Sequence, residues 1–290
     1  SPDEISSNIL LFNNSGSYGA DGISSMLIID DNNLDSINVC ELPEFPKNGF
    51  SSSGIIDVKL TNKEYNNDGT YYISDLYFLN RALGNFGGNP TTNFYITISQ
   101  LSSNFLFNYQ KIYSFGGFND DFAHDFELID NTSLETCAII VGSTESYGNS
   151  SYNQPVPYII KTNTLSVYGN ETTVNAIDWE LILDYKGQAR LITKLNNNNY
   201  LILIESNESI NDPYKIIEIN EFGDILCESS INLNDLIEDA SIYQNSLSRL
   251  NAIIPFGNNE FLLLGNYVVE SGSSATSNFD YLPARESKIV

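Results

Sequence analysis

Short runs of apolar residues separated by polar turns recur along the whole chain. The clearest example is residues 199–233, where YLILI at 200–204 is followed by YKIIEI at 214–219 and DILCESSI at 224–231. The joints between these runs carry Asn, Asp and Gly. Runs of this length with such joints predict antiparallel strands connected by turns. The pattern therefore predicts an all-β chain built from strand meanders.

The same unit returns at a nearly constant interval. Each second strand is expected to end at a polar or Gly residue, and successive ends lie 62, 67, 63 and 60 residues apart; they are Asn13, Asp75, Gly142, Glu205 and Gly265. Further apolar runs before and after these markers complete four strands in most units. Stretches rich in Gly, Asn and Ser separate the second and third strands and should lie at one rim; they are residues 15–25, 81–92, 143–157, 206–213 and 266–278.

Four antiparallel strands repeated at this period are typical of a β-propeller, in which each blade buries the apolar face of the next. We expect a single propeller domain over residues 1–290 with five four-stranded blades, six being the alternative. The expected repeats span approximately residues 1–47, 48–115, 116–184, 185–240 and 241–290. The first unit lacks an apolar run for its first strand. We expect the C-terminal segment 287–290 to supply that strand and close the ring.

Several motifs accompany the apolar runs between residues 110 and 265. They include CAIIVGSTE at 137–145, YIIK at 158–161, the pair Asp178-Trp179, and FGGF at 115–118 ahead of a first strand. This part of the chain resembles the repeats, roughly sixty residues long, of bacterial propeller proteins, many of which are secreted or lipoproteins. The resemblance implies the propeller fold and export. It implies no catalytic residue, because the family shares none.

The charge balance narrows the range of partners. The 37 acidic and 13 basic residues give a net charge of −24, which disfavours nucleic acid and anionic membranes. No apolar run approaches the ~20 residues needed to cross a bilayer. The chain begins at Ser1 without Met, so we expect a trimmed, exported chain that is periplasmic, outer-membrane-anchored or extracellular, with any lipid anchor preceding residue 1. We expect it to be a monomer.

Polar residues on the expected first strands are the candidates for chemistry, because first strands line the central channel of a propeller. They are Asp57, Lys59, His124, Asp125, Glu127, Arg190, Arg249 and Asn251. In the favoured interpretation Arg190, Arg249 and Asn251 bind a ligand, together with rim aromatics such as Tyr147 and Tyr152. In the alternative, a glycoside hydrolase or lyase, Asp57, Asp125 and Glu127 supply the acid and base, and His124 could serve as a base.

No phosphate-binding loop, dinucleotide fingerprint or serine nucleophile motif is present, and no cofactor is expected. The single histidine excludes multi-histidine metal sites. Residues 30–35 (DDNNLD) have the oxygen-ligand density of a calcium loop but lack its Gly and downstream Glu, so a tight turn is favoured. The sequence therefore predicts a non-catalytic binding or scaffold module for a carbohydrate or protein ligand. A hydrolase or lyase is the alternative, and a calcium-stabilised propeller is a third hypothesis.

Overall fold

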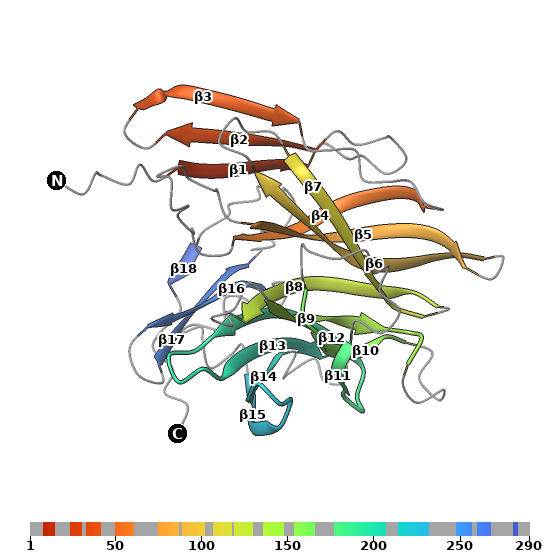
Figure 1. Ribbon diagram of the computed structural model, residues 1–290. Helices are drawn as coiled ribbons and strands as arrows, with labels where there is room; N and C mark the ends of the chain where they lie inside the picture. The colour runs from red at the N-terminus through yellow and green to blue at the C-terminus, as the bar shows by residue number, and fades with distance from the viewer. Residues whose placement is uncertain are drawn as a thin grey trace, which may run out of the picture. The chain divides into compact units, whose positions relative to one another are not determined.

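In the part of the chain that the computed structural model describes, every helix or strand element is a β-strand (Figure 1). The structure describes residues 8–14, 24–30, 33–41, 50–60, 75–86, 89–101, 107–117, 119–129, 136–147, 154–165, 177–206, 214–231, 248–256, 260–267 and 281–283. This part of the chain contains no helix that is long and apolar enough to cross a membrane.

The strands form antiparallel sheets whose members follow one another along the chain. The first sheet holds three strands, β1 (Asn8–Asn14), β2 (Ser24–Asp30) and β3 (Asn33–Glu41). The second holds four, β4 (Phe50–Leu60), β5 (Asp75–Phe86), β6 (Asn89–Leu101) and β7 (Phe107–Phe115).

Two further four-stranded sheets and one three-stranded sheet complete the described part of the chain. The third sheet contains β8 (Asp121–Ile129), β9 (Cys137–Thr144), β10 (Val156–Thr162) and β11 (Ile177–Ile182). The fourth contains β12 (Gly187–Lys194), β13 (Tyr200–Ser206), β14 (Tyr214–Ile219) and β15 (Ile225–Ile231). The fifth contains β16 (Ser248–Phe256), β17 (Glu260–Tyr267) and β18 (Tyr281–Pro283). The predicted all-β class and the repeated antiparallel meander are confirmed.

The described residues fall into two compact units. The first unit holds β1 to β7 and the start of β8 as far as Ala123, and the second holds β8 from His124 onward and β9 to β18. The predicted closing strand at residues 287–290 lies outside the described residues. The single domain, the ring closure and the number of blades stay predictions.

The second repeat differs from the sequence prediction. Asp75 does not end the second strand of that unit; it begins β5, which runs to Phe86. The residues 81–92 that were expected to form a loop are mostly strand, because β5 and β6 pair without interruption from Asp75↔Gln100 to Phe86↔Asn89. Their backbone groups bond one another in the ladder, so the Asn, Arg and Gly residues in this stretch do not end the strand.

The fourth sheet shows how the core of the second unit is built. Alternate residues of β13 point to opposite faces, as they must in an extended strand. Ile202 and Ile204 join Ile139 and Val141 of β9 in one apolar cluster. On the other face, residues of β13 and β14 meet the fifth sheet; this second cluster contains Leu201, Leu203, Tyr214, Ile216, Leu250, Ile253, Phe261 and Leu263.

Each large aliphatic side chain buried in this way contributes about 1.5–3 kcal/mol relative to its exposed state. Consecutive sheets of the second unit therefore stabilise each other by stacking face to face. The run YLILI, apolar at every position, reflects a strand that is covered on both faces.

Candidate ligand-binding rim

The sheets of the second unit have two ends, which carry different side chains and loops. At one end β9 and β13 finish and β10, β12, β14 and β16 begin; we call this end the loop rim. The backbone N–H of Gly187, the first residue of β12, donates to the carbonyl oxygen of Pro155 at 3.0 Å. This bond joins the third and fourth sheets at the loop rim.

A half-buried polar cluster lies on the first two strands of the fourth sheet at the loop rim. Glu205, on β13, accepts a hydrogen bond from Gln188 Nε2 at 2.9 Å, and its carboxylate lies 3.7 Å from Nε of Arg190. Gln188 and Arg190 both belong to β12, where Gln188 pairs with Glu205 in the ladder. One carboxylate, one amide and one guanidinium group are thus held together, with donors left over on the Arg and Gln side chains.

Arg190 owes its position to a β-bulge. The pairing of β12 with β13 passes from Ala189↔Ile204 to Leu191↔Leu203, so Arg190 is the extra residue. Asn251 occupies the same place in β16, between Leu250↔Gly265 and Ala252↔Leu264. A bulge redirects the side chain of its extra residue and is often found beside binding sites. Of the ligand-binding candidates, Arg190 and Asn251 therefore share one structural position, in successive sheets.

In the first unit, the same interruption in β4 leaves Ile56 as the extra residue, between Ile55↔Asn80 and Asp57↔Leu79. The bulge is therefore a recurrent feature of the first strands, whereas the side chain placed on it changes from Ile to Arg to Asn. A conserved backbone position with a variable side chain is compatible with ligand recognition that differs from one sheet to the next.

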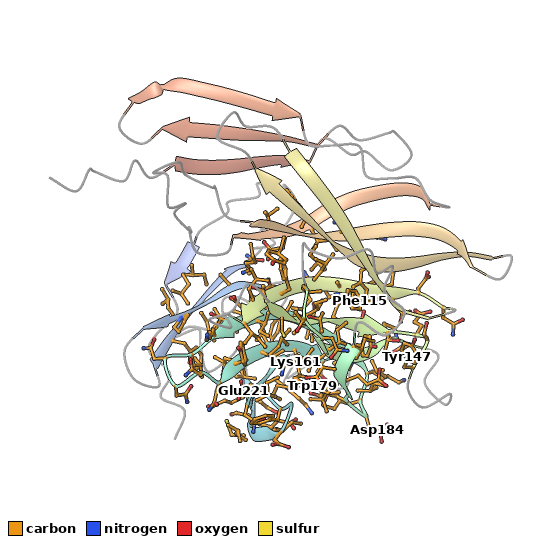
Figure 2. All side chains as sticks on the ribbon, viewed as in Figure 1. Phe115, Tyr147, Lys161, Trp179, Asp184 and Glu221 are labelled. Carbon is orange, nitrogen blue, oxygen red and sulfur yellow. The ribbon has the colours of Figure 1, made fainter. Side chains whose placement is uncertain are left out.

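Tyr147 adds an aromatic ring to the loop rim (Figure 2). It follows β9, and Thr144 Oγ1 accepts hydrogen bonds from the backbone N–H groups of Ser146 and Tyr147, both at 3.0 Å. Its ring lies 5.6 Å from the ring of Tyr158 and remains 37% exposed. An exposed ring that is braced from behind by a buried one can stack against a flat apolar face of a ligand.

Asp125 is engaged by the protein backbone. Its Oδ1 accepts from the N–H of Phe126 at 2.8 Å, and its Oδ2 accepts from the N–H of Ile192 on β12 at 2.9 Å. Because β12 is the edge strand of its sheet, such an N–H has no strand on that side to pair with. The Asp125 carboxylate therefore ties the third sheet to the fourth.

The other candidates on the first strands are placed as follows. His124 and Glu127 lie half-buried on β8, on either side of Asp125 in the chain. In the first unit, Asp57 Oδ1 accepts from the N–H of Val58 at 2.8 Å, and Oδ2 lies 3.6 Å from Nζ of Lys59. Arg249 is on β16, but its side chain lies outside the described residues, and Tyr152 lies outside them altogether.

The sequence did not single out Gln188 or Glu205 as site residues. Glu205 entered only as the polar residue that ends YLILI, and Gln188 did not enter at all. The strand order of the meander was the available signal. Because the first and second strands are antiparallel, a carboxylate at the end of the second strand should lie opposite the start of the first, where Gln188 and Arg190 are found.

The described residues contain no group of three or more His, Cys, Asp and Glu side chains that could hold a metal ion. Cys137 and Cys227 are free thiols, the first buried and the second half-buried. Burial raises the pKa of the Cys227 thiol, and the neighbouring carboxylate of Glu218 raises it further. This cysteine is therefore held in the protonated, weakly nucleophilic form.

Comparisons with known proteins give distant structural similarity alone. No family model matches the chain, and no curated protein is similar to it in sequence. A protein of unknown function from Bacteroides caccae is similar in structure, with a TM-score of 0.38 and 10% identity over 96% of this chain and 73% of that one. A glycoside hydrolase family 32 protein from Bifidobacterium adolescentis gives a TM-score of 0.40 and 8% identity, over 89% of this chain and 47% of that one. Neither likeness is close enough to carry an argument about function.

Proposed function

We propose that the chain is a β-propeller binding module that recognises a carbohydrate through the loop rim. The observation that carries the proposal is the Gln188–Arg190–Glu205 cluster, in which three polar side chains are partly removed from water at the ends of buried strands. Hydroxyl groups of a sugar both donate and accept hydrogen bonds, and this cluster offers both. Tyr147 supplies the stacking surface on the same rim.

The propeller arrangement is supported by the way consecutive sheets pack. In the second unit each sheet stacks face to face on the next, and side chains of one sheet bond the first strand of the following sheet. Continued round a ring, this packing would leave no apolar end face exposed. We propose a monomeric ring of five sheets, exported to the cell envelope or beyond, as the acidic surface and the repeat resemblance suggest.

A binding role is favoured over the hydrolase or lyase alternative by the contacts of Asp125. Both of its carboxylate oxygens accept backbone hydrogen bonds, which fix the group in place. A catalytic pair needs two carboxylates aimed at one substrate. Asp125 instead bonds the backbone of β12, the first strand of the next sheet.

A glycan array probed with the folded full chain tests the proposal. We expect binding to a restricted set of glycans that is lost in Arg190→Met, which keeps the apolar stem but removes the guanidinium group. Tyr147→Phe should retain the binding, whereas Tyr147→Ser should weaken it. Asp184→Asn is the control, because this exposed carboxylate lies outside the cluster.

An array without any hit, combined with a protein captured in a pull-down through the same Arg190-dependent rim, would replace carbohydrate by protein as the ligand class. Blank results in both assays would overturn the binding function. Release of reducing sugar by the wild-type chain, abolished in Asp125→Asn without loss of folding, would establish the hydrolase alternative instead.

A further inference from the structure

The end of the second unit opposite the loop rim presents an exposed apolar tip among acidic residues. This tip is formed by the turn between β14 and β15 and by the first residues of β15. We call residues 218–228 the acidic hairpin. Phe222 is 69% exposed, and Leu226 and Ile225 are 51% and 41% exposed. Three adjoining exposed apolar side chains of this size on one hairpin are a candidate contact surface.

The hairpin is held in one conformation by a dense set of hydrogen bonds. Asn220 Oδ1 accepts from the N–H groups of Phe222 at 3.0 Å and Asp224 at 2.9 Å, and Asn220 Nδ2 donates to Asp224 Oδ2 at 2.9 Å. The N–H of Gly223 donates to the carbonyl oxygen of Asn220 at 3.1 Å, and Gly223 adopts a φ of 85°. The turn is therefore fixed before any partner arrives.

Trp179 of the neighbouring third sheet packs against this turn and forms a hydrogen bond with it. Its indole Nε1 donates to the carbonyl oxygen of Glu221 at 3.1 Å (both residues are labelled in Figure 2). Its ring lies against Gly223, where an added Cβ would be 3.1–3.2 Å from three ring carbons. The two anchors hold the turn in place while the Phe222 side chain between them stays exposed. A surface fixed in advance loses little conformational entropy on binding.

A bulge explains why Leu226 faces outward. The pairing of β14 with β15 passes from Ile219↔Ile225 to Glu218↔Cys227, so Leu226 is the extra residue. The third sheet has the same interruption between Thr162↔Ile177 and Lys161↔Trp179, where the extra residue is Asp178, a charged and exposed side chain. Leu226 thus occupies a bulge position that carries an exposed carboxylate in the neighbouring sheet. The fold therefore does not require an apolar residue at this position.

The charges around the tip restrict the partner. Residues 218–228 carry four acidic side chains, Glu218, Glu221, Asp224 and Glu228, and no Lys or Arg. Glu218 is engaged by Asn197 and Asn199, and Glu228 by Lys215 at 3.2 Å, whereas Glu221 beside Phe222 is exposed. A second copy of this chain, with a net charge of −24, or an anionic membrane would be repelled.

We infer that the acidic hairpin is a docking site for a cationic protein segment that carries arginine beside apolar side chains. An arginine guanidinium can lie over the Phe222 ring while bonding the Glu221 carboxylate, and apolar side chains can cover Ile225 and Leu226. This inference is independent of the carbohydrate proposal, because the loop rim and the acidic hairpin lie at opposite ends of the sheets. Either can fail while the other stands.

The test uses the folded full chain and a labelled peptide of alternating arginine and leucine, with an alternating glutamate and leucine peptide as the charge control. Peptide anisotropy measures affinity, and the emission of Trp179, the only tryptophan, reports contact at the hairpin. We expect saturable binding of the arginine peptide, a change in Trp179 emission, and several-fold weaker binding when salt is raised to about 0.3 M.

Phe222→Ser should weaken the binding of the arginine peptide about tenfold, as expected for the loss of a central contact residue. Glu221→Gln should weaken it less and reduce the salt dependence. Ile254→Ser is the matched control, because Ile254 is 44% exposed on β16 and its replacement leaves the net charge unchanged. Circular dichroism confirms that each variant is folded.

Three results would overturn the inference. They are equal binding of the arginine peptide to wild type and Phe222→Ser, equal binding of the glutamate peptide, and an unchanged Trp179 emission at saturation. Each would show that the peptide either does not bind or is attracted by the general negative charge of the chain.

Discussion

At the scale of single residues, the backbone contacts of Asp125 give this carboxylate a structural role. The sequence placed Asp125 among the polar residues of a first strand, which is compatible with either role. Its partner Ile192 is 67 positions away in the chain, and no local pattern links the two. The role of Asp125 therefore becomes apparent only when two sheets are seen stacked.

Asp125→Asn tests this role. The amide can accept one of the two backbone N–H groups but turns its own NH₂ group toward the other, which leaves that N–H without an acceptor. We expect the free energy of unfolding to fall by about 1–3 kcal/mol, the typical cost of an unsatisfied buried group. Urea denaturation measures the change. The exposed control Asp184→Asn should alter stability by less than about 0.5 kcal/mol, and an equal effect of both variants would contradict the structural role of Asp125.

Two glycines provide a second test at this scale. Gly223 has φ 85° and Gly187 has φ 151°, and an added Cβ would meet the Trp179 ring at the first position and the Glu205 carbonyl oxygen at the second. We expect Gly223→Ala to cost at least about 1–2 kcal/mol from its backbone conformation alone.

Gly187→Ala should cost more than Gly223→Ala, because a backbone carbonyl cannot move aside as a side chain can. Thermal melts followed by circular dichroism compare the two variants. The emission of Trp179 should shift in Gly223→Ala and remain unchanged in Gly187→Ala. The reverse order of stability would show that the start of β12 adapts more readily than the hairpin.

At the scale of elements, neighbouring sheets are joined by side chains that bond the edge of a first strand. Just as Asp125 accepts a hydrogen bond from the edge strand β12, Tyr214 of β14 accepts one from the edge strand β16. Its hydroxyl oxygen accepts from the N–H of Leu250 at 3.3 Å. Both N–H groups belong to first strands at the edge of their sheets. Capping by the preceding sheet protects these edges and fixes the sheets relative to each other.

Tyr214→Phe tests the link and gives a defined pH dependence. Burial raises the pKa of Tyr214, the Glu205 carboxylate raises it further, and the Leu250 N–H opposes both. Because the folded chain holds this proton more tightly, the associated stability is complete below the usual tyrosine pKa of about 10 and is lost as pH rises through the higher folded value.

We expect the variant to be less stable than wild type by about 1 kcal/mol at pH 7, from the lost hydrogen bond. Above pH 10 the wild type should lose stability more steeply, so that the difference becomes smaller. Urea denaturation at a series of pH values measures both effects. A difference that stays constant up to pH 11 would show that Tyr214 does not resist ionisation in the folded chain.

Strand prediction succeeded where both faces of a strand are apolar and was less accurate elsewhere. The runs at 200–204 and 214–219 correspond to β13 and β14 almost residue for residue, because burial on two faces requires apolar side chains at nearly every position. β5 was misplaced because its distal half, around Asn80, Arg81 and Gly84, is held by ladder hydrogen bonds rather than by an apolar pattern. Bulges escaped prediction for the same reason, since the backbone pairing defines them and the sequence does not mark them.

At the scale of the whole molecule, the repeat was readable because stacking, as the second unit shows it, imposes the same apolar requirement on successive sheets. Leu203 packs against the fifth sheet and Ile204 against the third, so both faces of the same strand must be apolar. The same requirement in successive sheets produces the repeated apolar runs in the sequence. The candidate site was less readable, because Gln188, Arg190 and Glu205 come together through strand pairing and a bulge. Fold class is thus encoded in many equivalent positions, whereas recognition depends on a few that differ between sheets.

Cooperative unfolding distinguishes one closed ring from two separately stable units. A ring in which every sheet needs both neighbours should melt in a single transition, with a calorimetric enthalpy of about 200 kcal/mol for a chain of this length and an equal van't Hoff enthalpy. Differential scanning calorimetry measures both. Tyr214→Phe, which weakens a contact within the second unit, should then move the entire transition to lower temperature. Two transitions, only one of which moves in the variant, would mean that the two units fold independently and that the sheets do not close into one cooperative ring.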